Sequence, residues 1–97
     1  MTMERCKQKA KGLLIISNDR GLHTRPSTEL VKCASRYKAQ ISLIYEKIEV
    51  NAKSILGVLT LAAERGAKVR VEASGDDAEE AVAEILALGQ RNFNIKY

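Results

Sequence analysis

Short segments of alternating hydrophobicity are interleaved along this chain with segments of helical periodicity, and this order most constrains the fold. The strand-like segments are residues 12–17, 39–45, 48–51 and 67–73. The segments with apolar side chains three and four apart are residues 24–37, 54–63 and 76–89. Each strand has one apolar face and each helix has one apolar stripe. The order β-α-β-β-α-β-α therefore predicts an α+β open-faced β-sandwich, a four-stranded antiparallel sheet with three helices on one face.

The starts of the first two helices can be placed from single residues. Pro26 fits the first turn of a helix but not its interior, so the first helix begins close to His23. Ser54 is suited to the N-cap of the second helix. The expected buried stripe of that helix consists of Ile55, Val58, Leu59 and Ala62. This stripe leaves Leu56 pointing toward solvent or a partner.

The length of the chain and the distribution of its apolar residues indicate the class of protein. The 97 residues suffice for one domain, which we place at residues 10–97 after a basic N-terminal extension over residues 1–9. No apolar run approaches the ~18 residues of a membrane span, and residues 1–11 lack the apolar core of a signal peptide. We therefore expect a cytoplasmic protein with no membrane insertion.

The net charge of +4 leaves a basic nucleic-acid binder as one alternative. Residues 1–11 carry +3 of that charge, however, and the folded part is nearly neutral. No cluster of aromatic side chains accompanies the basic tail, so we expect no nucleic-acid partner.

The single histidine, His23, lies between a tight turn and the first turn of a helix. The N–H groups of Thr24 and Arg25 in that first turn suit an anion such as a phosphoryl group, and the Arg25 guanidinium adds a permanent cation. Imidazole is a competent nucleophile near neutral pH. Taken alone, His23 is better explained as a surface or helix-start histidine with no role. One histidine and two distant cysteines cannot make a zinc site or a catalytic triad, and no cofactor is expected.

Two segments of the sequence stand out as motifs: Gly21-Leu22-His23-Thr24-Arg25-Pro26-Ser27, and residues 50–61 with Ser54 near their start. The first resembles the phosphorylation-site signature of the HPr family, the histidine-containing phosphocarriers of the bacterial phosphoenolpyruvate-dependent sugar phosphotransferase system. The second is similar to the segment of that family that carries the regulatory serine. The resemblance covers roughly residues 10–93, and the family has the same order of strands and helices.

The resemblance implies a monomeric phosphoryl carrier, not an enzyme in its own right. Enzyme I, phosphorylated by phosphoenolpyruvate, passes its phosphoryl group to Nδ1 of His23, and enzyme IIA removes it. Arg25 neutralises the phosphoryl group, and Ser54 is phosphorylated by an ATP-dependent HPr kinase/phosphorylase. The implied docking residues are Thr24, Arg25, Thr28, Lys32, Leu56 and Leu59.

Some alternatives stay open at this level. The chain could be a regulatory phosphoprotein or binding module that acts mainly through Ser54, without sugar transport. Leu59 also fits the buried stripe of the second helix. Arg20 stands where many relatives have a small polar residue, so the hydrogen bonding around His23 does not follow from the resemblance.

Overall fold

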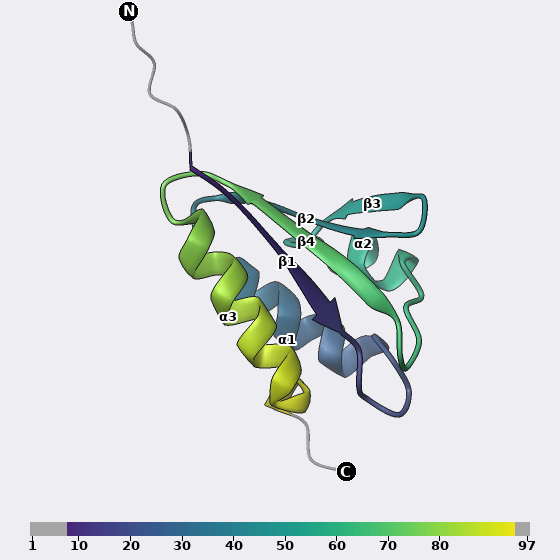
Figure 1. Ribbon diagram of the computed structural model, residues 1–97. Helices are drawn as coiled ribbons and strands as arrows, with labels where there is room; N and C mark the ends of the chain where they lie inside the picture. The colour runs from purple at the N-terminus through teal and green to yellow at the C-terminus, as the bar shows by residue number, and fades with distance from the viewer. Residues whose placement is uncertain (1–7, 95–97) are drawn as a thin grey trace, which may run out of the picture.

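The computed structural model describes residues 8–94 and places four strands and three helices in the predicted order. The strands are β1 (Lys9–Ile15), β2 (Gln40–Tyr45), β3 (Ile48–Asn51) and β4 (Lys68–Ser74), and the helices are α1 (Thr24–Ala34), α2 (Ile55–Thr60) and α3 (Ala78–Gln90), followed by the 3-10 turn η1 (Asn92–Asn94). The strands form one antiparallel sheet in the order β1-β4-β2-β3 (Figure 1). The predicted fold class is confirmed.

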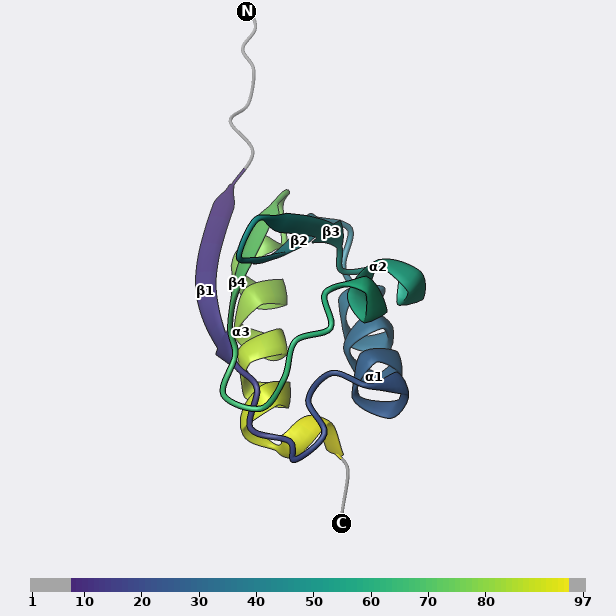
Figure 2. The same cartoon turned by 90° about the vertical axis from the view of Figure 1, so that its right-hand side faces the viewer.

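The helices lie on one face of the sheet and enclose the core against it (Figures 1 and 2). Alternation along β4 shows the two faces: Val69 and Val71 are fully buried, while Lys68 and Arg70 are exposed. The core combines strand residues with residues of all three helices, among them Leu14, Ile41, Leu43, Leu30, Val58 and Ile85. Cys33 of α1 also belongs to this core, and its burial raises the pKa of the thiol.

Strand β1 begins earlier than the hydrophobic pattern predicts. It pairs with β4 from Lys9 opposite Ser74 to Ile15 opposite Lys68, instead of covering residues 12–17. Its first residues, Lys9-Ala10-Lys11, carry little apolar surface, so backbone pairing and not hydrophobicity extends the strand there. α3 packs closely against β1 at Gly12, where an added Cβ would lie only 2.8 Å from Val82 Cγ1.

Helix α2 is shorter than predicted, and its buried stripe is different. The helix ends at Thr60, and Ala62 adopts a left-handed φ of 50° and is exposed. Leu61 is buried in its place, because the chain no longer follows a helical period there. Of the other expected stripe residues Val58 is buried, Leu59 is half-buried and Ile55 is 37% exposed. The prediction was therefore wrong for Ala62 and Ile55.

The predicted extension over residues 1–9 and the C-terminal end of the predicted domain fall largely outside the described residues, and those boundaries stay predictions. Within residues 8–94, no helix has the length and apolar character that crossing a bilayer requires. The same residues hold no cluster of three or more side chains suited to binding a metal ion.

Candidate functional site

His23 is the N-cap residue of α1. Its backbone is extended, with φ −83° and ψ −164°, and its residue is half-buried. The backbone N–H of Ser27 donates to the His23 carbonyl at 3.0 Å, which closes the first turn of the helix. Helix geometry leaves the N–H groups of Thr24 and Arg25 without an intrahelical acceptor, and Pro26 has no N–H. Two backbone donors and an exposed guanidinium therefore follow His23 directly in the chain.

Three hydrogen bonds hold the loop before His23. Gly21 N–H donates to the Asn18 carbonyl at 3.0 Å, and Leu22 N–H donates to the Ala63 carbonyl at 2.9 Å. The buried Ser27 hydroxyl donates to the Leu22 carbonyl at 3.1 Å. Gly21 has a φ of +70° and packs against the Ala63 carbonyl, so a side chain at this position would be both strained and obstructed. The backbone that presents His23 therefore has one well-defined conformation.

Three of the predicted docking residues lie on one face of α1. Thr24, Thr28 and Lys32 are four residues apart, so they are stacked along the helix. Thr24 and Lys32 are exposed and Thr28 is half-buried, with its hydroxyl donating to the Thr24 carbonyl at 2.9 Å. Lys32 lies 3.7 Å from the Glu29 carboxylate. This face of α1 starts next to His23 and carries positive charge at Lys32.

Helix α2 brings the remaining predicted residues beside α1, against which it packs (Figure 2). Leu56 is 78% exposed, and Leu59 is half-buried. Ser54 is the N-cap of α2, and its hydroxyl oxygen accepts a hydrogen bond from Gly57 N–H at 3.1 Å. The predicted N-cap role of Ser54 and the exposure of Leu56 are thus confirmed.

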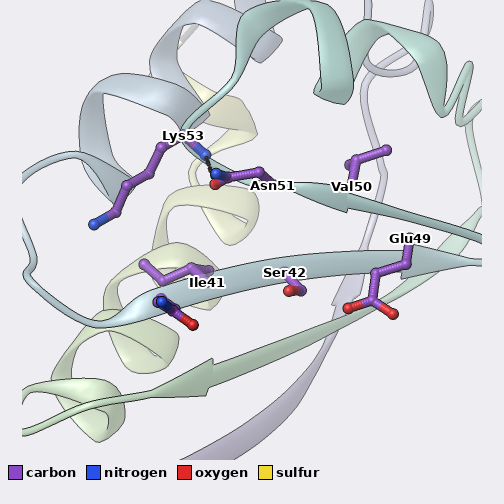
Figure 3. Close-up of a pocket in the computed structure, with 7 residues that line it drawn as sticks. Ile41, Ser42, Glu49, Val50, Asn51 and Lys53 are labelled. Carbon is purple, nitrogen blue, oxygen red and sulfur yellow. Dashed lines mark hydrogen bonds between the residues drawn. The ribbon is translucent and has the colours of Figure 1, made fainter.

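A polar hollow of about 740 Å³ lies along β2 and β3 (Figure 3). It is lined by Gln40, Ile41, Ser42, Glu49, Val50, Asn51 and Lys53. Lys53 Nζ donates to the carbonyl of Tyr37, which follows the C-terminal end of α1, whereas His23 precedes the N-terminal end. The hollow and His23 are therefore at opposite ends of α1, and His23 does not line this hollow.

The sequence did not single out the residues that hold the His23 loop. Ser27 lies within the recognised motif, but only its burial and its bond to Leu22 show its role. Ala63 acts through its backbone carbonyl, some 40 residues along the chain, and a carbonyl leaves no signal in a sequence. Asn18 gave no signal beyond its place in a turn.

Comparison with known proteins assigns the chain to a family. The family model described as "PTS HPr component phosphorylation site" matches residues 11–91. The chain belongs to the HPr family. The phosphocarrier protein HPr of Xylella fastidiosa (strain 9a5c) is 40% identical over 81 residues, which are 84% of this chain and 91% of that HPr.

Solved HPr structures have the same fold. The HPr of Thermoanaerobacter tengcongensis is similar with a TM-score of 0.86 and 35% identity, over 91% of this chain and 99% of that one. The HPr of Bacillus anthracis (str. Ames) gives a TM-score of 0.78 and 34% identity, over 81% and 94%. The family confirms the predicted role as a phosphocarrier of the phosphotransferase system, and the alternative of a module acting mainly through Ser54 is not favoured.

Proposed function

We propose that His23 is the residue that carries the phosphoryl group, accepting it from phosphorylated enzyme I and donating it to enzyme IIA. The observation that carries the proposal is the position of the only histidine at the N-terminus of α1, directly before two N–H groups without an intrahelical acceptor. Arg25, exposed in the same helical turn, supplies a permanent positive charge.

The transfer needs few groups from this chain. The lone pair of Nδ1 of His23 attacks the phosphorus, and the N–P bond forms as the bond from phosphorus to the enzyme I donor breaks, its electrons staying with that donor. The phosphoryl oxygens then accept hydrogen bonds from Thr24 N–H, Arg25 N–H and the guanidinium. Enzyme IIA reverses the step, and His23 is regenerated unchanged.

The partner proteins supply the specificity of the relay. The proposed contact surface comprises Thr24, Arg25, Thr28, Lys32, Leu56 and Leu59 on α1 and α2. It joins positive charge with the exposed Leu56 side chain, which suits a brief contact of modest area with an acidic and partly apolar surface. We infer a cytoplasmic monomer, since this surface must be available to enzyme I and to enzyme IIA in turn.

Ser54 is the proposed site of regulatory phosphorylation by an HPr kinase/phosphorylase. Its hydroxyl is half-buried at the start of α2, two residues before Leu56. A phosphate there adds roughly 1.5 to 2 negative charges beside the proposed contact surface. Such a charge repels an acidic partner, so phosphorylation of Ser54 would slow the transfer to His23.

The test is labelling with phosphoenolpyruvate that carries radioactive phosphorus, in the presence of purified enzyme I. We expect one acid-labile, base-stable phosphate on the wild-type chain, mapped to His23, and no label on His23→Ala. Ser54→Ala serves as the matched control and takes up the label normally. Label on His23→Ala, or an unlabelled wild type under conditions that label another HPr, would contradict the proposal.

A further inference from the structure

Asn18 joins the loop that presents His23 to the C-terminal turn of the described chain. Its side chain is buried, with the residue only 1% exposed, and Nδ2 donates to the carbonyl of Asn92 at 3.2 Å. The Ser17 hydroxyl adds a bond to Asn92 Oδ1 at 3.0 Å. The Asn18 carbonyl in turn accepts from Gly21 N–H, two residues before His23. Figure 2 shows the turn beside this loop, at the end of the fold where α1 begins.

The turn is itself firmly anchored. Asn92, Phe93 and Asn94 all have positive φ values, of 56°, 55° and 61°, a conformation that phenylalanine adopts only when its surroundings impose it. Phe93 is completely buried in the core, and η1 packs against both α1 and α3. The Asn92 carbonyl therefore has a fixed position to which the loop can be tied.

Stability alone does not account for an asparagine at position 18. Its Oδ1 is buried without a hydrogen-bond partner within residues 8–94, and such an oxygen costs free energy on folding. An apolar side chain of similar size would avoid this cost, but it would lose the bond to the Asn92 carbonyl. What only the amide supplies is a directed link from the Asn92 carbonyl to the backbone turn before His23.

We propose that Asn18 is a positioning residue, and that its link to Asn92 holds the loop so that His23 faces the incoming phosphoryl group. This inference rests on the proposed role of His23. The series of contacts begins with Phe93 in the core, which fixes the neighbouring Asn92 carbonyl. That carbonyl binds the Asn18 side chain, and the Asn18 carbonyl in turn binds the N–H of Gly21. Losing the link lets the loop move while leaving the docking faces of α1 and α2 intact.

The role predicts a specific pattern in transfer kinetics. In Asn18→Ala we expect the kcat for transfer from enzyme I to fall roughly tenfold, because small misplacements of a reacting group are costly. The KM for enzyme I stays unchanged, because the proposed contact residues are elsewhere. Asn94→Gly is the matched control: it removes the bond from Arg91 Nε to Asn94 Oδ1 in the same turn and leaves both bonds between Asn92 and the loop in place.

A second control separates positioning from stability. Ile85→Val removes a methyl group from the buried face of α3 and lowers stability, and Ile85 makes none of the hydrogen bonds that tie Asn18 and the loop to the turn. If Asn18 served only the stability of the fold, Ile85→Val and Asn18→Ala would lower kcat equally whenever they lower the free energy of unfolding equally. That result, or a rise in KM at unchanged kcat in Asn18→Ala, would overturn the inference.

Amide hydrogen exchange tests the link without enzyme I. In Asn18→Ala we expect faster exchange at the N–H groups of Gly21 and Leu22, with exchange in β4 unchanged. If the wild type takes no label on His23, the proposed function fails, whereas this local change still establishes that Asn18 holds the loop. Unchanged exchange at both amides would refute the positioning role even if His23 is the carrier.

Discussion

At the scale of single residues, the Ser54 hydroxyl group combines an observed role with a proposed one. It caps α2 by accepting a hydrogen bond from Gly57 N–H, and it is the proposed acceptor of a regulatory phosphate. A carboxylate can replace the cap and also imitates part of the phosphate charge, whereas a methyl group does neither. Substitutions at this one position therefore distinguish the loss of the cap from the gain of charge.

We expect Ser54→Ala to lower the free energy of unfolding by about 1 kcal/mol and Ser54→Asp to change it by only a few tenths. The KM for enzyme I responds in the opposite way: Ser54→Asp raises this KM, and Ser54→Ala leaves it unchanged. Urea unfolding and initial transfer rates measure the two effects. An equal rise of KM in both variants would show that the cap, and not the charge, controls docking.

At the scale of elements, Asp77 connects the start of α3 to the chain between α1 and β2. The sequence favours a capping box from Asp76 to Glu79, but the N-cap residue is Asp77, and its side chain makes no capping bond. Its carboxylate instead accepts from the N–H groups of Lys38 at 2.9 Å and Ala39 at 2.8 Å. These two bonds, that from Lys38 foremost, lower the pKa of Asp77.

A lowered pKa in the folded state means that ionised Asp77 stabilises the fold. This contribution is complete above the pKa of an unfolded aspartate, near 4, and is lost as the pH falls through the lower folded value. Asp77→Asn should therefore be less stable than the wild type at pH 6, with the difference shrinking below about pH 4. Thermal unfolding across this range measures it, with the neighbouring exposed residue in Asp76→Asn as control. A difference independent of pH would contradict the linkage.

Element order was predictable here because each strand and helix has a clear hydrophobic period, but several boundaries were not. The start of β1 depends on pairing of Lys9 with Ser74, which a hydrophobic pattern cannot report. The end of α2 depends on Ala62 taking a left-handed conformation, although alanine favours helix. Long-range contacts decide both boundaries, and neither is encoded in a local window of sequence.

At the scale of the whole molecule, the local and the assembled parts of the site differ in how far the sequence could predict them. His23 and Arg25 lie within one short motif at a helix start, so their proximity follows from chain connectivity. The proposed docking surface combines α1 with α2, and the packing of these helices against each other is a property of the complete fold. Asn18 and Asn92 are 74 residues apart, and only the folded chain shows their contact.

The two faces of the molecule provide a direct test of the proposed docking surface. Leu56 on α2 and Leu13 on β1 are both exposed leucines, at 78% and 49%, but Leu13 lies on the sheet face opposite the helices. Replacing either with serine should leave stability within about 0.5 kcal/mol, because an exposed side chain loses little packing. Leu56→Ser should raise the KM for enzyme I at least several-fold, because it removes apolar surface from the contact. Leu13→Ser should leave that KM unchanged, and an equal effect of both substitutions would place docking elsewhere.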